Sequence, residues 1–253
     1  MTVRLYAMTC GWLTMPAPFL MEGESGTVKV PVPCYLIEHP DGLALFDSGL
    51  HVHTQEDPDG ELGPLAQYFK IHFEPGEEVS ARLAAMDRDI SRLTYLINSH
   101  LHFDHAGGNH QIPNAPVLIQ KREWEAAHTP EFEEANGYER RLYDLGHDVK
   151  TIDGEHDVFG DGSVVCLPTY GHTPGHQSLK LKLAGGDVVL TGDACYLRRT
   201  LEEMRLPLIK ADADAMLKSL NLFKTLQQRG ARIFYGHDPE FWQDVPQAPL
   251  EIR

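Results

Sequence analysis

The sequence predicts a single α/β domain over residues 1–253, with β-hairpins in both halves of the chain and helices between them. Three observations support this fold class. Segments that alternate apolar and polar residues occur in pairs around short turns. Helical periodicity appears in separate segments, most clearly near the C-terminus. No linker divides the chain, and 253 residues is an ordinary length for one α/β domain.

Two hairpins are the clearest strand predictions. "VPCYLIE" and "LALFDSG" flank the turn "HPDG", while "SLKLKL" and "DVVLTGD" flank "AGG". The short, apolar and partly β-branched "LTYLINS" predicts a strand that ends near Ser99, and "ARIFY" predicts another strand. Sheet therefore occurs in both halves of the chain.

Helices are predicted at "SARLAAMDRD", in "KREWEAAH" and in "DADAMLKSLNLFKTLQQRG". In the last of these, apolar residues fall at helical spacing from Met216 to Leu226, and Gly230 is placed to end the helix. The segment 121–162 is the most polar and the least strand-like. We interpret it as a solvated helical excursion, with a lid or pocket wall as the alternative.

Composition limits the kind of partner. The 37 acidic side chains outnumber the 22 basic ones, and a net charge of −15 repels phosphate backbones, which argues against nucleic acid. No apolar run approaches the length of about 20 residues that spans a bilayer. The four cysteines are scattered and have no CxxC spacing, which is typical of reduced thiols, so we expect a cytoplasmic protein.

The stretch "INSHLHFDHAGGNH" gathers four metal-capable side chains directly after a predicted strand. Alternation along the extended chain points His100 and His102 to one side. Asp104 and His105 follow where the chain must turn, and we expect the glycines of "AGGN" to give the backbone the freedom to do so. The two pairs can therefore face two adjacent metal ions.

Three further strand ends supply the missing ligands. His172 lies in the loop of "VVCLPTYGHTPGHQS", Asp193 follows the strand in "VVLTGDACY", and His237 follows the strand in "RIFYGHD". Five histidines and two aspartates make a three-His site, an Asp-His-His site and one carboxylate that bridges them. We expect two divalent ions per chain, zinc in the first instance, although iron, cobalt and manganese accept the same ligands.

The remaining histidines are interpreted without a metal. His51 and His53 form a His-X-His pair for which the sequence shows no partner within reach. His176 is expected to form hydrogen bonds within its own turn. Four others lie in polar surroundings and are interpreted as surface residues, namely His110, His128, His147 and His156.

Four motifs, in this order and spacing, resemble the metallo-β-lactamase superfamily over nearly the whole chain. They are His-X-His-X-Asp-His at His100–His105, "GHTPGH" at His172, "GDA" at Asp193 and "GHD" at His237. The resemblance implies an αββα sandwich with a dinuclear metal site at one edge of the sheets. Within the superfamily the chain is most similar to the N-acyl-homoserine lactonases, which are quorum-quenching enzymes. The narrower match comes from "HLHFDH", with Phe103 before the aspartate, from "GHTPGHQSL", and from "DACY", which places Tyr196 where these lactonases have a substrate-polarising tyrosine.

The resemblance implies a hydrolase that opens a lactone ring. A hydroxide held between the two ions attacks the carbonyl carbon, Tyr196 stabilises the oxyanion, and Asp104 passes a proton to the departing alkoxide. Asp47 either orients a ligand imidazole or closes an Asx turn. Pyridoxolactonase-like, phosphotriesterase-like and arylesterase-like activities are alternatives, and a non-catalytic metal-dependent binding protein is another.

For the substrate tail, "MPAPFLME" resembles the substrate-covering loop of the lactonases. Met15, Phe19 and Met21, together with Phe103, offer an apolar patch for an acyl chain. Met15, Phe19 and Met21 have two other interpretations, which are packing in the core and contact in a homodimer.

Overall fold

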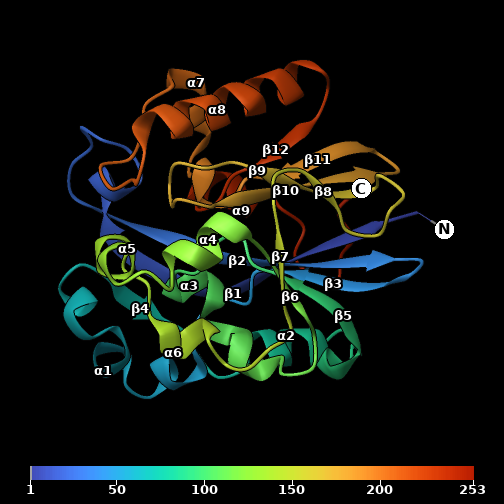
Figure 1. Cartoon of the computed structure of the whole chain (residues 1–253), viewed down its shortest axis with the longest axis horizontal. Coiled ribbons are helices and arrows are strands. Elements are labelled where there is room, and N and C mark those ends of the chain that lie inside the picture. The colour runs from blue at the N-terminus through green and yellow to red at the C-terminus, as the bar shows by residue number, and fades with distance from the viewer. Residues whose placement is uncertain (1) are drawn as a thin grey trace.

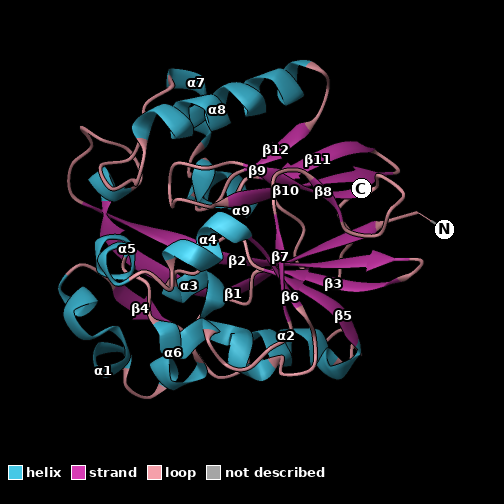
Figure 2. Cartoon of the chain, in the orientation of Figure 1, coloured by secondary structure: helices cyan, strands magenta, loops and turns pink. Residues whose placement is uncertain are grey.

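The structure is a computed structural model that describes residues 2–253. Two β-sheets pack face to face, and helices cover the outer side of each sheet (Figure 1). This is the four-layered αββα arrangement that the family resemblance implied, and Figure 2 shows the strands enclosed between the helical layers. Among residues 2–253, no helix is long and apolar enough to cross a membrane.

The first sheet has seven strands in the order β4-β1-β2-β3-β5-β6-β7, and the second has five in the order β12-β11-β10-β9-β8. The strands of the first sheet are β1 (Arg4–Pro16), β2 (Thr27–His39), β3 (Gly42–Phe46), β4 (Lys70–His72), β5 (Leu93–Ile97), β6 (Val117–Gln120) and β7 (Val149–Ile152). Those of the second sheet are β8 (His156–Asp157), β9 (Val164–Pro168), β10 (Gln177–Leu183), β11 (Gly186–Leu190) and β12 (Arg232–Phe234).

Both predicted hairpins are confirmed, because β2 pairs with β3 and β10 pairs with β11 in antiparallel register. The inner faces of the two sheets form one apolar core in which Tyr35 and Phe46 of the first sheet meet Leu179 and Leu190 of the second. Alternate residues of each strand therefore point into the space between the sheets, as a two-layered sandwich requires.

Helices on the first side pack against the outer face of the first sheet and its connections. They are α1 (Pro58–Leu62), α2 (Val79–Ala84), α3 (Phe103–Ala106), α4 (Lys121–Ala126), α5 (Pro130–Asn136) and α6 (Arg140–Tyr143). The remaining helices lie in the C-terminal part of the chain, namely α7 (Arg198–Glu203), α8 (Ala213–Gln228) and α9 (Pro239–Gln243).

The sequence of helix α8 explains where the helix begins, which face it buries and where it ends. Asp212 accepts a hydrogen bond from the Ala215 N–H at 3.0 Å and so caps the helix. Met216, Leu220 and Phe223 are fully buried at helical spacing, and Leu220 and Phe223 pack in a cluster with Val189 and Ile233 of the second sheet. Gly230 has a φ of 96°, the left-handed conformation that ends helices, as the sequence predicted.

The segment 121–162 differs from the expected solvated excursion. It does carry α4, α5 and α6, but it also adds β7 to the first sheet in parallel with β6. The strand Val149–Ile152 is rich in β-branched residues, and the sheet edge overrides the polarity of the surrounding segment. Phe132 and residues 134–137 of this segment line a cavity, so its role as a pocket wall is the one that the structure supports.

Strand direction places the polar loops together. Strands β3, β5 and β6 run parallel to one another in the first sheet, and β11 and β12 run parallel in the second. The carboxyl ends of parallel strands meet at one edge of a sheet. The segments that follow β3, β5, β11 and β12 therefore converge where the edges of the two sheets meet.

Gly107 and Gly108, which follow α3, are needed here because they have no side chain and not because they adopt a special backbone conformation. Gly107 has an ordinary helical φ of −59°, which corrects the expectation that a special conformation is needed. A Cβ on Gly107 would lie 2.5 Å from the backbone nitrogen of His51, and one on Gly108 would lie 2.2 Å from the carbonyl oxygen of Ser48. The two glycines let this turn pack directly against the loop after β3.

Candidate metal centre and substrate cavity

Three imidazoles converge in front of β5. Nε2 of His100 lies 2.9 Å from Nδ1 of His102, and Nε2 of His172 lies 3.2 Å and 3.1 Å from these two atoms. His100 and His102 follow β5, whereas His172 comes from the loop after β9. Three ring nitrogens at this spacing are arranged as the ligands of one tetrahedral metal ion.

A second group forms beside the first. Oδ2 of Asp104 lies 3.6 Å from Nε2 of His105 and 3.6 Å from Nε2 of His237. Asp104 and His105 are on the short helix α3, while His237 follows β12 of the other sheet. All three residues are buried.

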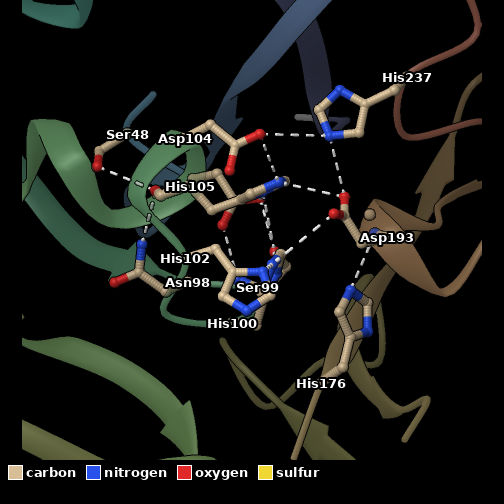
Figure 3. A network of polar contacts seen from close by, with 12 residues as sticks. Ser48, Asn98, Ser99, His100, His102, Asp104, His105, His176, Asp193 and His237 are labelled. Atoms are coloured by element: carbon tan, nitrogen blue, oxygen red, sulfur yellow. Dashed lines mark hydrogen bonds and ion pairs between the residues drawn. The ribbon is translucent and has the colours of Figure 1, made fainter. Parts of the chain in front are cut away.

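Asp193 lies between the two groups (Figure 3). Its Oδ1 is 3.1 Å from Nε2 of His105 and 3.2 Å from Nε2 of His237. Its Oδ2 is 3.4 Å from Nε2 of His172 and 3.8 Å from Nε2 of His100. Each oxygen faces a different group, which is the arrangement of a carboxylate that bridges two ions.

The far nitrogen of each imidazole has its own partner, which leaves the inner nitrogen for a metal. His102 contacts the Asn136 carbonyl oxygen at 2.6 Å, and His237 contacts the Pro31 carbonyl oxygen at 2.7 Å. His100 contacts the Ser99 hydroxyl at 3.0 Å. His105 and His172 contact Asp47 and Tyr196 respectively.

The electrostatics of the buried centre fit a pair of cations. Burial and the neighbouring His105 and His102 hold the pKa of His100 well below its usual value, so the ring is a neutral donor. Burial opposes a charge on His105, yet the carboxylates of Asp193, Asp104 and Asp47 outweigh burial and raise its pKa. This carboxylate-rich side therefore attracts positive charge.

Two buried atoms support the same conclusion. Nε2 of His105 and Oδ1 of Asp193 lie 3.1 Å apart, yet neither has a hydrogen-bond partner within the described part of the chain. Buried polar atoms are normally paired, because desolvation without a partner costs about 1–3 kcal/mol. Two divalent ions held by these seven side chains would satisfy both atoms.

Asp47 and His176 form hydrogen bonds to two of the clustered residues, His105 and Asp193 respectively. Asp47 lies in the left-handed region with a φ of 58°, and its Oδ2 is 2.8 Å from Nδ1 of His105. It also accepts the Ser99 backbone N–H at 2.6 Å. His176 contacts the Thr169 hydroxyl in its own turn and accepts the Asp193 backbone N–H at 3.0 Å. Asp47 therefore has the contact of an orienting residue, and His176 lies behind the bridging carboxylate.

Glu123 is a residue that the sequence analysis missed. Its fully buried carboxylate accepts hydrogen bonds from the Leu101 N–H at 3.2 Å and the Gly175 N–H at 2.9 Å. The hydroxyls of Thr173 and Tyr138 donate to it at 2.7 Å and 2.9 Å. Leu101 stands between two of the three clustered histidines and Thr173 directly follows the third, so this carboxylate joins both ligand loops.

A sequence signal for Glu123 was present in "KREWEAAH". The residue lies three and four positions before Ala126 and Ala127, both of which are buried, so it falls on the apolar face of its helix. A carboxylate on such a face needs donors from elsewhere. Burial raises its pKa to about 7 even though four donors face it.

We expect Glu123→Leu to lower the free energy of unfolding by about 3–5 kcal/mol, because four buried donors lose their acceptor. Tyr138→Phe, which removes only one of the four donors, should cost about 1 kcal/mol. Denaturant unfolding of the chelator-treated proteins measures both values without a contribution from metal. Equal losses of unfolding free energy in Glu123→Leu and Tyr138→Phe would contradict the role of Glu123 in joining the two loops.

Tyr196 lies beside the three-His group. Its hydroxyl is 3.2 Å from Nδ1 of His172, and its ring stacks on that of His237 with 5.7 Å between centroids. Burial, followed by the charges of Asp193 and Asp104, raises the pKa of Tyr196 well above its usual value. The phenol is therefore placed next to both groups as a protonated hydrogen-bond donor.

A cavity of about 660 Å³ opens onto the three-His side of the centre. His102 and His172 form its polar end, and Leu65, Phe69 and Phe103 form an apolar wall. Most of the remaining lining comes from two segments, Phe132 and residues 134–137 around the end of α5 and residues 209–212 before α8, and Arg122 and Pro174 complete it. A cavity of this size accommodates a small organic molecule.

The N-terminal patch lies elsewhere than expected. Met15 is buried in a core cluster that also contains Tyr196, Met21 is fully buried, and neither lines the cavity. Phe19 packs behind the apolar wall, 5.9 Å from the ring of Phe69. Of the four predicted acyl-chain residues, only Phe103 reaches the cavity, because strand β1 and the turn after it carry the others into the core beneath it.

Comparison with known proteins gives a family and several close matches. Residues 27–237 match the family model described as the metallo-beta-lactamase superfamily. The N-acyl homoserine lactonase AttM of Azorhizobium caulinodans is 33% identical over 98% of this chain and 97% of its own. An N-acyl homoserine lactonase of Bacillus cereus is 35% identical over 84% of this chain and 83% of its own.

Solved structures agree with the sequence matches. An N-acyl homoserine lactone hydrolase with N-hexanoyl-L-homoserine bound at its catalytic metal centre has a TM-score of 0.89 and 30% identity, with 100% of both chains covered. The similarity therefore includes the strands and loops that carry the centre.

Proposed function

Because this chain belongs to the metallo-β-lactamase superfamily, we propose that it is a metal-dependent hydrolase that opens the lactone ring of N-acyl homoserine lactones. The observation that carries the proposal is the position of Asp193, whose two oxygens face two groups of ligands at the end of an apolar-walled cavity. The relatives at 33% and 35% identity carry the name of this activity, and a structural neighbour holds the hexanoyl product.

The metal centre of the proposal consists of the seven clustered side chains. His100, His102 and His172 would hold one ion, Asp104, His105 and His237 the other, and Asp193 both. Two divalent ions supply Lewis acidity and an activated water for attack on a carbonyl carbon. We propose zinc as the metal, since imidazole and carboxylate ligands in groups of three suit it.

Tyr196 is proposed to donate a hydrogen bond to the carbonyl oxygen of the substrate. When Nε2 of His172 binds metal, its Nδ1 carries the proton and donates to the Tyr196 oxygen 3.2 Å away. The phenolic hydrogen is then free to point at the substrate. A fixed donor at an oxyanion is strongest in a buried site such as this one.

Asp104 is proposed to accept the proton that the attacking water releases as it adds to the carbonyl carbon, and to pass that proton to the ring oxygen as the ring opens. Its Oδ2 lies 3.6 Å from Nε2 of both His105 and His237, so the carboxylate lies beside the proposed second ion. The Ser48 and Asn98 side chains hold the carbonyl of His105 at 3.1 Å and 3.2 Å and so keep α3 in place. A proton donor must be held in this way to reach the leaving group.

The acyl chain is proposed to lie along Leu65, Phe69 and Phe103. Phe19 supports this wall from behind, and the ring of Phe69 meets that of Phe103 at 5.3 Å. Binding of the chain to aliphatic and aromatic side chains gains about 0.8 kcal/mol for each methylene that leaves water. A longer chain should therefore lower KM until the wall ends.

The test is acid release from hexanoyl- and decanoyl-homoserine lactone, with metal-loaded protein and a chelator-treated control. We expect rapid release from the loaded protein and a loss of at least about a hundredfold after metal removal, since the activated water is lost. No release from protein that holds two ions per chain would contradict the choice of substrate. The same preparation assayed with paraoxon and aryl esters would then show which electrophile it accepts.

A further inference from the structure

A second group of potential ligands lies outside the dinuclear centre, at the 3₁₀ turn Val52–Gln55 and helix α1. We propose that His51, His53 and Glu61 form a separate transition-metal site that takes a single divalent ion such as Zn²⁺. The sequence showed His51 and His53 as a pair without a partner, and α1 brings Glu61 back to them. The proposal concerns a different site and does not depend on lactone hydrolysis.

The distances fit a small cation. Oε2 of Glu61 lies 3.7 Å from Nδ1 of His51, and Oε1 of Glu61 lies 3.7 Å from Nδ1 of His53. Two ligands of a tetrahedral zinc ion, each about 2.0–2.1 Å from the metal, are about 3.4 Å apart. These two pairs need to close by only a few tenths of an ångström, all three ligand atoms lie within 4.8 Å of one another, and the His53 side chain, which is 67% exposed, is free to move toward the other two.

The ligands are held in a state that accepts metal. Burial and the neighbouring His110 lower the pKa of His51 to about 4, so its imidazole is neutral at pH 7. Nδ1 of His51 accepts only the His53 backbone N–H at a long 3.3 Å, a contact that a cation readily displaces. Arg141 contacts the side chain and the carbonyl of Glu61, which fixes the carboxylate, and Glu139 balances the charge of this arginine.

His110 provides an independent indication of a ligand. Its Nδ1 contacts the Gly107 carbonyl oxygen at 2.9 Å, so its Nε2 carries a lone pair. Within the described chain this buried Nε2 has no hydrogen-bond partner, although the His110 ring lies 4.1 Å from that of His51. A water bound to the cation would supply the missing donor.

The site lies directly behind the substrate cavity. His51, Glu61 and Arg141 line a void of about 10 Å³, enough for one small atom, and Phe103 closes the same void. Phe103 also forms part of the apolar wall on its other side. An ion here would fasten the loop after β3 and helix α1 together next to that wall.

The test counts zinc ions bound per chain. Chelator-treated wild type, His53→Ala and His156→Ala are equilibrated with the same micromolar concentration of free Zn²⁺, and bound metal is measured by elemental analysis. His156 is a matched control, because it lies in β8 of the other sheet. We expect His53→Ala to bind one ion fewer than wild type and His156→Ala to bind the same number as wild type.

A competition assay with a chromogenic chelator adds the affinity. The weakest ion of the wild type should be lost from His53→Ala or bind at least about tenfold more weakly, because one of three ligands is gone. Equal zinc content in all three proteins overturns the site, and so does an equal loss from both variants. The result is a difference between variants, so it holds whether or not the dinuclear centre hydrolyses lactones.

Discussion

Asp193→Ala is expected to lower kcat/KM for hexanoyl-homoserine lactone by about a thousandfold and to release metal from both groups of ligands. Its two oxygens face both groups, at 3.1 Å from His105 and 3.4 Å from His172. Without the carboxylate, the five clustered imidazoles keep Asp104 as their one acidic co-ligand in the proposed centre, and the two ions would lose the negative charge between them. A thousandfold decrease in kcat/KM corresponds to the loss of several kcal/mol of transition-state stabilisation.

Metal content by elemental analysis and initial rates of acid release measure the two effects. Asp187→Ala is the matched control, because it removes the same charge from the other end of β11. A variant of Asp193 that keeps two ions and wild-type turnover would show that the carboxylate does not bridge.

Tyr196→Phe is expected to lower kcat by roughly 10²–10³ while metal content stays at the wild-type value, because a single oxyanion donor is removed. The ring that stacks on His237 remains, so the packing of the centre is unchanged. Initial rates over a range of substrate concentrations separate kcat from KM. A donor that acts in the transition state should affect kcat far more than KM.

The control for this variant is Tyr95→Phe, which removes a hydroxyl from the middle of β5. There the Tyr95 ring contacts Phe159 and Lys150 rather than the ligands. Full activity in the Tyr196 variant would remove the phenol from the mechanism. Loss of metal together with activity would instead make Tyr196 a support for His172.

The clustering of the seven candidate metal ligands could be predicted from the sequence because each follows a strand that the sequence also shows. Ile97 and Leu190 end apolar strands, and the polar residues that come next have no other obvious function in a short turn. Parallel strands then bring these turns to one edge, whichever residues fill the core. The order of the motifs along the chain was therefore enough.

The contacts of Glu123 and Glu61 could not be predicted in the same way. Glu123 accepts a hydrogen bond from Thr173, 50 residues away, and its donors are two backbone amides and two hydroxyls that lie outside its own helix. His110 reaches His51 only because two glycines allow close packing of their loops. Such contacts depend on how helices sit on the sheet, which residue patterns along one element do not define.

The burial of Met15 and Met21 has a similar cause. Both are apolar and flexible, which suits a core and a binding surface equally well. The course of β1 and of the turn after it decides between them, and the sequence around "MPAPFLME" does not state that course. The cavity instead takes its walls from several segments that are distant in the chain.

The proposed ligands of the dinuclear centre come from both sheets, and this has a consequence for folding. His100, His102, Asp104 and His105 follow a strand of the first sheet, whereas His172, Asp193 and His237 follow strands of the second. Neither sheet alone carries all seven proposed ligands, so both ions would bind only to chains in which the two sheets have packed together. By mass action, free metal at a thousand times its dissociation constant would stabilise the docked state by about 4 kcal/mol. The supply of metal would then govern the lifetime of the folded protein as well as its turnover.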